Sequence, residues 1–189
     1  MRKLKLQIHI SIDGFVGGPN GEMDFKWDAD TRNYSLTNLE EVDLILLALR
    51  RHTQMSFIPY WASAADNPKD PDFAIGKKLT DTPKLVFSRA LAKSEWANTK
   101  VVNGEIVEEI TQLKKQPGGD MIAFGGARFA STLIKHQLID EFHLLVNPVA
   151  LGSGLPIFKE LDSKQNMTFV KSKAFDCGIV WLHYEPRND

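Results

Sequence analysis

The sequence predicts an α/β domain of three layers, in which helices cover both faces of a central mixed β-sheet. Two observations support this prediction: short apolar runs alternate with helical patterns through most of the chain, and two strand-like runs follow one another at its end. Alternating strands and helices build parallel sheets, whereas directly successive strands pair as an antiparallel hairpin. The length of 189 residues suits one domain, and we expect a single domain over residues 1–189.

The N-terminal part of the chain is predicted to begin with a strand. Apolar and polar residues alternate over residues 4–12, and Asp13-Gly14 ends this strand. The continuous apolar run 42–49 is typical of a strand buried on both faces, although a buried helix fits it as well. The tetrapeptide Thr37-Asn38-Leu39-Glu40 before that run has the form of a capping box. The proline-containing stretch 59–73 is interpreted as a long surface loop.

The C-terminal part is predicted to alternate strands with helices before the final hairpin. Ile106, Ile110 and Leu113 recur at helical spacing, so an amphipathic helix is expected there. The predicted strands are residues 85–87, 101–102, 121–124, 141–149, 167–173 and 179–184, and the predicted helices are residues 105–115 and 127–136.

The composition argues against several classes of protein. With a formal net charge of −1, the chain has no general attraction for nucleic acid or for a membrane surface, and we expect neither partner. The single cysteine, Cys177, excludes an intramolecular disulfide and a cysteine-rich zinc site. The five histidines show no metal-ligand spacing, so no metal is expected. The first residues form neither a signal peptide nor a membrane span, and the expected location is the cytoplasm.

The most informative local feature is a strand that breaks at Gly125-Gly126 and is followed at once by a helix. The unpaired N–H groups at the start of a helix point at whatever lies above the turn, and paired glycines let a phosphate approach the backbone. This geometry suits the pyrophosphate of a dinucleotide. The same arrangement is also an ordinary strand-to-helix connection, and the fuller glycine-rich fingerprint is absent.

Several short motifs resemble, in their order and spacing, those of one known family. They are Ser11-Ile12-Asp13-Gly14, Gly21-Glu22-Met23-Asp24 with Trp27 shortly after, Ser88-Arg89, Gly125-Gly126, Leu138-Ile139-Asp140-Glu141 and Pro148-Val149-Ala150-Leu151-Gly152. The sequence resembles, over nearly its whole length, the stand-alone relatives of the reductase domain of bacterial riboflavin biosynthesis, which share the dihydrofolate reductase fold. The resemblance implies a dihydrofolate reductase-like sheet, NADPH bound across its carboxyl edge, a small-molecule substrate and a homodimer.

The resemblance also implies which residues bind the cofactor. Ser88 and Arg89 would lie near the adenosine 2′-phosphate, although Arg89 suits a solvated loop equally well. The nicotinamide would lie against the end of the first strand, from His9 onward, and against Val16. The residues implied to hold the pyrophosphate through their backbone are Gly125, Gly126, Ala127 and Arg128.

Two departures from the family pattern bear on the ligands. Relatives carry Gly-Arg-x-Thr after the second strand, whereas this chain has Arg51-His52-Thr53 with a shift and without the glycine. Arg51 and Thr53 are candidate cofactor-binding residues, and the preference for NADPH over NADH stays open. The riboflavin-pathway reductases also tend to carry a glutamate just before the glycine turn, where this chain has Phe124. A phenyl ring accepts no hydrogen bonds from a ribosylaminopyrimidine, which disfavours that substrate.

Three aspartates are candidates for the group that supplies a proton during reduction. Asp13 ends a strand at the sheet edge where ligands gather, although it also suits a turn aspartate. Asp28 and Asp30 lie in the region where dihydrofolate reductases place their catalytic acid, and both also suit the first residues of a helix. The candidate substrate-binding residues are aromatic, because aromatic rings stack on planar ligands: Trp27, Trp61 and Phe124.

The sequence therefore predicts an NADPH-dependent reductase of a small heterocyclic or carbonyl substrate. The main alternative is a non-catalytic nucleotide-binding member of the same fold, because the Arg-x-Thr element is altered and no carboxylate is clearly the acid. Dihydrofolate reduction ranks lower, since no unambiguous carboxylate follows Trp27.

Overall fold

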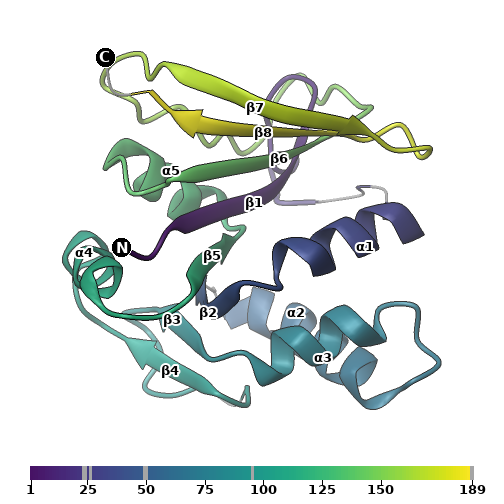
Figure 1. Cartoon of the computed structure of the whole chain (residues 1–189), viewed down its shortest axis with the longest axis vertical. Helices are drawn as coiled ribbons and strands as arrows, with labels where there is room; N and C mark the ends of the chain where they lie inside the picture. Colours follow the sequence, from purple (N-terminus) through teal and green to yellow (C-terminus); the bar gives the residue numbers. More distant parts are fainter. Residues whose placement is uncertain (23–24, 26, 49–50, 95, 188–189) are drawn as a thin grey trace.

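The computed structural model describes residues 1–22, 25, 27–48, 51–94 and 96–187, without the side chains of residues 51–58. In this part of the chain one sheet contains β1 (Leu4–Ser11), β2 (Val42–Leu47), β3 (Lys84–Phe87), β4 (Thr99–Val102), β5 (Asp120–Phe124), β6 (Glu141–Asn147), β7 (Met167–Ala174) and β8 (Val180–Pro186). Their order in the sheet is β4-β3-β2-β5-β1-β6-β8-β7 (Figure 1). Neighbours from β4 to β6 are parallel, and β8 is antiparallel to β6 and β7.

Helices cover both faces of the sheet, as Figure 1 shows. One face carries α4 (Ile106–Lys115) and α5 (Ala127–Lys135), and the other carries α1 (Ala29–Asn38), α2 (Arg51–Asp66) and α3 (Phe73–Asp81). An apolar cluster fills the space on each side, the larger one under α4 and α5. The predicted three-layer α/β fold with a C-terminal antiparallel hairpin is confirmed. No helix among the described residues is long and apolar enough to span a lipid bilayer.

Most predicted elements of the C-terminal part are present, with shifts of a few residues at their ends. The apolar run 42–49, for which strand and helix were both open, forms the central strand β2. Glu105, at the start of the predicted amphipathic helix, is the N-cap of α4.

Two predictions in the N-terminal part are wrong. The predicted surface loop at residues 59–73 contains the second half of α2, and irregular backbone is confined to residues 67–72. Pro59 lies inside α2, where it removes one backbone hydrogen bond without ending the helix. The predicted capping box at Thr37 is also wrong, because Thr37 lies in the last turn of α1. The capping box of α1 is formed instead by Asp28 and Thr31 at its start.

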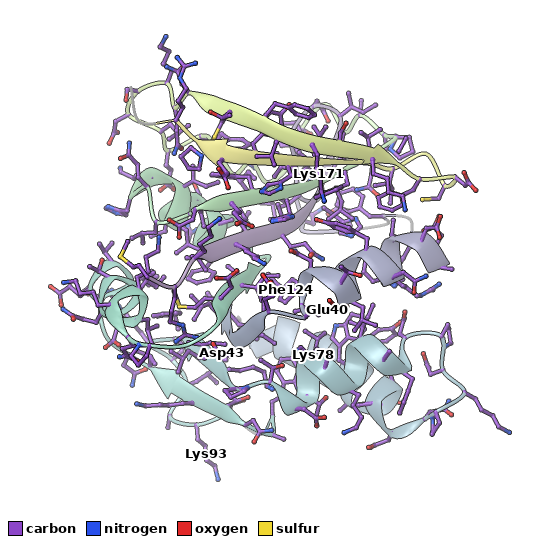
Figure 2. The ribbon with its side chains drawn as sticks, viewed as in Figure 1. Glu40, Asp43, Lys78, Lys93, Phe124 and Lys171 are labelled. Atoms are coloured by element: carbon purple, nitrogen blue, oxygen red, sulfur yellow. The ribbon has the colours of Figure 1, made fainter. Side chains whose placement is uncertain are left out.

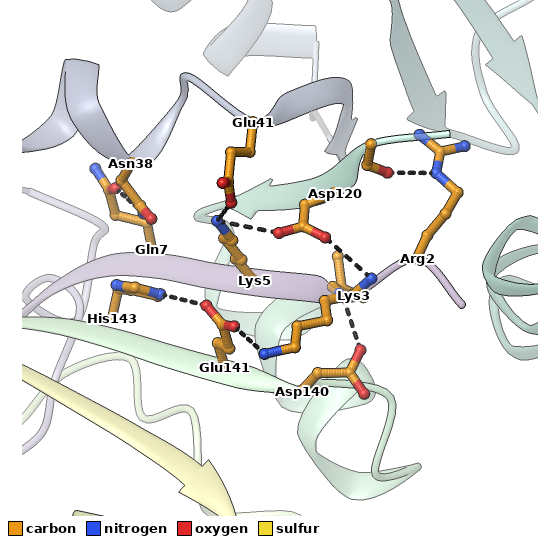
Figure 3. Close-up of polar contacts among 12 residues, drawn as sticks. Arg2, Lys3, Lys5, Gln7, Asn38, Glu41, Asp120, Asp140, Glu141 and His143 are labelled. Atoms are coloured by element: carbon orange, nitrogen blue, oxygen red, sulfur yellow. Dashed lines mark hydrogen bonds and ion pairs between the residues drawn. The ribbon is translucent and has the colours of Figure 1, made fainter. Parts of the chain in front are cut away.

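The polar side chains of β1 are buried because α1 covers their face of the sheet. Gln7 Nε2 donates a hydrogen bond to Ser35 Oγ at 2.9 Å, and Asn38 Nδ2 donates to Gln7 Oε1 at 2.7 Å (Figure 3). Lys5 Nζ forms an ion pair with Asp120 Oδ2 at 3.2 Å. The face of β1 under α1 is therefore a layer of paired polar groups, whereas its opposite face is apolar.

Candidate functional site

The candidate site lies at the edge of the sheet where the carboxyl ends of the parallel strands meet. β5 lies between β1 and β2, and the connection that leaves β1 forms α1 on one face of the sheet. The connection that leaves β5 forms α5 on the other face. Two adjacent parallel strands whose connections diverge in this way leave a crevice at their carboxyl ends, which is where open α/β sheets bind ligands.

The turn after β5 leaves its backbone open at this edge of the sheet. φ is +50° at Gly125 and +76° at Gly126, a conformation that residues with a Cβ disfavour. A Cβ placed on Gly125 would meet no atom within 4 Å, so a ligand has room directly against the backbone. Gly126 is the N-cap of α5 and offers no side chain to the first N–H groups of the helix, which begin at Ala127. These groups and the helix dipole suit an anion such as a pyrophosphate.

His9 lies beside this turn and contacts two aromatic rings. Gln7 pairs with Phe124 in the sheet, which puts the end of β1 next to the turn that follows β5. The His9 ring stacks on Phe25 at a centroid distance of 6.0 Å and is tilted against Trp27 at 5.5 Å. Two aromatic neighbours and a place beside the glycine turn suit a planar ligand such as a nicotinamide.

The protonation state of His9 is set by burial and by Asn147, a residue that the sequence analysis did not single out. Asn147 lies at the end of β6, and its Nδ2 donates to His9 Nδ1 at 3.2 Å. The proton of the neutral ring therefore resides on Nε2. Burial lowers the pKa of His9 to about 4, so the imidazole is neutral at pH 7.

A buried aspartate that the sequence analysis also missed fixes the orientation of Trp27. Asp72 is 2% exposed, and its Oδ1 accepts hydrogen bonds from Trp27 Nε1 at 3.0 Å and from Arg32 Nε at 2.5 Å. The hydroxyl of Tyr60 donates to its other oxygen. Burial acts to raise the pKa of Asp72, but the hydrogen bonds from Tyr60, Trp27 and Arg32 lower it overall. No local sequence pattern marks Asp72, because its partners are 12 to 45 residues away in the chain.

Asp13 connects the end of β1 to the loop that follows β6. Its carboxylate accepts hydrogen bonds from Ser11 Oγ at 2.6 Å, from the Gly152 N–H at 2.7 Å and from the Leu151 N–H at 3.1 Å. These hydrogen bonds, with that from Ser11 the largest, lower the pKa of Asp13 to about 2. The carboxyl group is therefore ionised at pH 7 and holds no proton to donate.

Asp28 and Asp30 lie at the start of α1. The side chain of Asp28 accepts hydrogen bonds from the Thr31 N–H and hydroxyl, each at 2.8 Å. The hydrogen bond from the Thr31 N–H is the main reason why the pKa of Asp28 is lowered to about 2. Asp30 is exposed in the first helical turn, where a negative charge favours the helix dipole.

Ser88 and Arg89 directly follow β3 at the same edge. β3 is separated from β1 by β2 and β5, which is about 14 Å at the usual strand spacing. Arg89 Nη2 forms an ion pair with Glu105 Oε1 at 2.8 Å, and the two side chains are 82% and 70% exposed. Ser88 is half-buried, and its N–H donates to the Val102 carbonyl at 3.1 Å.

The remaining predicted site residues differ in how accessible they are. Val16 is buried in the larger apolar cluster, whereas Ala127 is half-buried and Arg128 exposed in the first turn of α5. Phe124 and Trp61 are half-buried and pack against the second apolar cluster, and Figure 2 shows Phe124 between β5 and α1. Arg51 and Thr53 lie in the first turn of α2, but their side chains are outside the described part of the chain.

Comparisons with known sequences identify relatives along the whole chain. Residues 2–181 match the family of the RibD C-terminal domain. The Bacillus subtilis protein YyaP is 34% identical over 187 residues, which cover 97% of this chain and 94% of that protein. A second B. subtilis protein, YwjB, is 25% identical over 97% of both chains.

Solved structures show the same fold. A putative riboflavin biosynthesis protein from Shewanella aligns over the full length of both chains with a TM-score of 0.73 and 22% identity. The Thermotoga maritima diaminohydroxyphosphoribosylaminopyrimidine deaminase/5-amino-6-(5-phosphoribosylamino)uracil reductase aligns with a TM-score of 0.69 and 13% identity, over 98% of this chain and 57% of that one. The family match over nearly the whole length and the identity to YyaP show that this chain belongs to the RibD C-terminal domain family of reductase-like proteins.

Proposed function

We propose that this protein binds NADPH along the carboxyl edge of its sheet and reduces a small heterocyclic or carbonyl substrate. The observation that carries the proposal is the turn at Gly125-Gly126, where the backbone is open and the first N–H groups of α5 have no side-chain cap. Membership of a reductase-like family supports the same function. When bound, NADPH supplies the hydride.

Different residues around the turn would bind different parts of the cofactor and the substrate. The backbone from Gly125 to Arg128 would hold the pyrophosphate, since the space beside Gly125 is open and no side chain caps the first N–H groups of α5. His9 and Trp27 would orient the nicotinamide and the substrate ring. Asp72 keeps Trp27 in one orientation through its hydrogen bond to Nε1. The apolar ring of Phe124 favours a planar substrate with few hydrogen-bonding groups over a ribosylaminopyrimidine.

The pKa values of the carboxyl groups favour water, rather than an acidic side chain, as the source of the proton. Every carboxyl group with a shifted pKa in the described residues is shifted downward: Asp13, Asp28, Asp72 and Glu141. A general acid that works near neutral pH has a raised pKa instead. The same observation favours the second candidate function, a nucleotide-binding protein without turnover.

Replacement of Gly125 by alanine tests the cofactor site. The added Cβ meets no protein atom, so it projects into the space where the pyrophosphate would lie. We expect Gly125→Ala to weaken NADPH binding at least tenfold in a titration that follows tryptophan fluorescence. Gly21→Ala is the matched control, because Gly21 also has a positive φ and its Cβ would meet only a leucine methyl group at 3.9 Å.

Two results would contradict the cofactor site: no saturable binding of NADPH or NADH by the wild type up to millimolar concentration, or equal losses in the two alanine variants. NADPH oxidation with a panel of carbonyl compounds, folates, flavin precursors and quinones then separates the two candidate functions. Saturable binding without oxidation of NADPH by any of them supports the non-catalytic candidate.

A further inference from the structure

A second group of chemically active side chains lies on β6 and β8, across β1 from the strand that leads into the glycine turn. Glu141 and His143 belong to β6, and His183 lies directly opposite His143 on β8. The pairing of Lys5 with Glu141 and of Gln7 with His143 puts this group beside the first half of β1. Gln7 pairs with Phe124 on one side and with His143 on the other, so the group is separated from the end of β5 by two strand spacings, about 10 Å.

The three side chains bring one possible ligand atom each close together. The His143 and His183 rings are stacked, with centroids 4.4 Å apart and planes inclined by 20°, so one ring has to turn for both Nε2 atoms to face a single ion. One ligand atom of each side chain lies within 4.8 Å of the other two. Glu141 Oε2 is 3.1 Å from His143 Nε2 and 3.8 Å from His183 Nε2. Ligand atoms around a tetrahedral zinc ion are about 3.3 Å apart when its bonds are near 2.05 Å, so the two distances bracket the required value.

The environment of these atoms is buried and incompletely paired. The side chains of Glu141, His143 and His183 are 10%, 6% and 12% exposed. His183 Nε2 is buried and has no hydrogen-bond partner among the residues described. A buried nitrogen without a partner is unfavourable, and a metal ion bound by the three side chains would satisfy it.

The surrounding contacts match those that support metal ligands in proteins. The Tyr34 hydroxyl lies 2.6 Å from His143 Nδ1, which leaves Nε2 as the ligand atom and fixes the ring orientation. Lys3 Nζ binds the other oxygen of Glu141 at 2.7 Å, as Figure 3 shows, and Oε2 is left for the ion.

We propose that Glu141, His143 and His183 form a zinc-binding site that links β6 to the C-terminal hairpin. Two imidazoles and one carboxylate are a ligand set that zinc prefers, and a water molecule would complete the tetrahedron. Sequence spacing does not reveal this site, because His183 is far from His143 in the chain and only the pairing of β8 with β6 brings them together. The ion would stabilise the packing of β8 on the sheet rather than take part in hydride transfer.

Titration of the metal-free full-length protein with Co²⁺, followed by displacement with Zn²⁺, tests the site. We expect one equivalent of Co²⁺ to bind with the intense visible absorption of a tetrahedral complex, and Zn²⁺ to abolish that absorption. His183→Ala and Glu141→Gln should each weaken binding at least 100-fold. His136→Ala removes an exposed histidine at the end of α5 and should leave the affinity unchanged.

A measurement on the wild type keeps the test independent of whether the variants fold. Long-range ¹H–¹⁵N spectra of the imidazoles should show Nε2 shifts for two of the five histidines when one equivalent of Zn²⁺ is added. The proposal is overturned by the absence of stoichiometric binding up to millimolar metal. It is also overturned if folded His183→Ala binds as tightly as the wild type, or if His136→Ala causes the loss.

Discussion

At the scale of single residues, Arg89 is paired with Glu105 in the structure, whereas the proposed function would pair it with the 2′-phosphate of NADPH. It forms an ion pair with Glu105 on the surface, where such pairs contribute less than about 1 kcal/mol. A 2′-phosphate offers a bidentate partner of higher charge. Arg89→Ala should therefore raise the Kd for NADPH about tenfold and change the Kd for NADH little, as measured by isothermal titration. Glu105→Gln should lower the Kd for NADPH several-fold, because it releases the guanidinium.

Lys93→Ala is the control for a general loss of positive charge. Lys93 lies in the same β3–β4 connection, and Figure 2 shows it projecting away from the body of the protein. Lys93→Ala should leave the affinities for NADPH and for NADH unchanged. Equal losses of NADPH and NADH affinity in Arg89→Ala would show that Arg89 does not contact the 2′-phosphate.

The residues that could be predicted from sequence are those whose role is local. The glycine turn is visible because the strand, the two glycines and the helix are consecutive. Asp72 and Asn147 could not be found in this way. Each is positioned by partners from other elements, and an isolated aspartate or asparagine carries no signal of its own.

At the scale of elements, α1 shows why helices were harder to predict than strands. Its buried residues are Thr31, Ser35 and Asn38, because it packs on the polar face of β1. Such a helix has no apolar stripe, so its sequence lacks the amphipathic pattern by which helices are recognised. α2 was missed for a different reason, since Pro59 in its interior resembles a loop residue. The inner strands, α4 and α5 bury apolar side chains, and the resulting sequence patterns make them predictable.

Replacements at the N-cap of α1 distinguish a structural role of Asp28 from a catalytic one. Asp28→Ala should lower the free energy of unfolding by about 1 kcal/mol in urea denaturation, because the Thr31 N–H loses its acceptor. Asp30→Ala removes a charge from the same turn, but Asp30 makes no capping hydrogen bond. This replacement should lower the free energy of unfolding by less than about 0.5 kcal/mol. Asp28→Asn keeps the cap but cannot act as an acid. Lost turnover in Asp28→Asn at unchanged stability would assign Asp28 a catalytic role.

At the scale of the whole molecule, β1 joins two regions of different chemistry. Its carboxyl end carries His9 beside the glycine turn, and its amino half borders the proposed zinc ligands on β6. Both regions use the polar face of β1, which is buried under α1 and the loop before it. Each region contains a histidine whose pKa is lowered by burial, His9 in the first and His183 in the second, and such residues couple the stability of the fold to pH.

His9 should make the protein less stable as the pH falls below neutral. Its pKa is about 4 in the folded protein and 6.5 in the unfolded chain, so only the unfolded chain binds a proton between these values. The free energy of unfolding should be highest above pH 6.5 and should fall between pH 6.5 and 4, with His9 contributing on the order of 3 kcal/mol. Urea denaturation at half-unit steps of pH measures this. His9→Gln should flatten the curve, with a residual slope from His183, whose pKa is also lowered. His136→Gln, at an exposed position, should give the same pH dependence as the wild type. Parallel curves for the wild type and His9→Gln would show that His9 has the same pKa in the folded protein and in the unfolded chain.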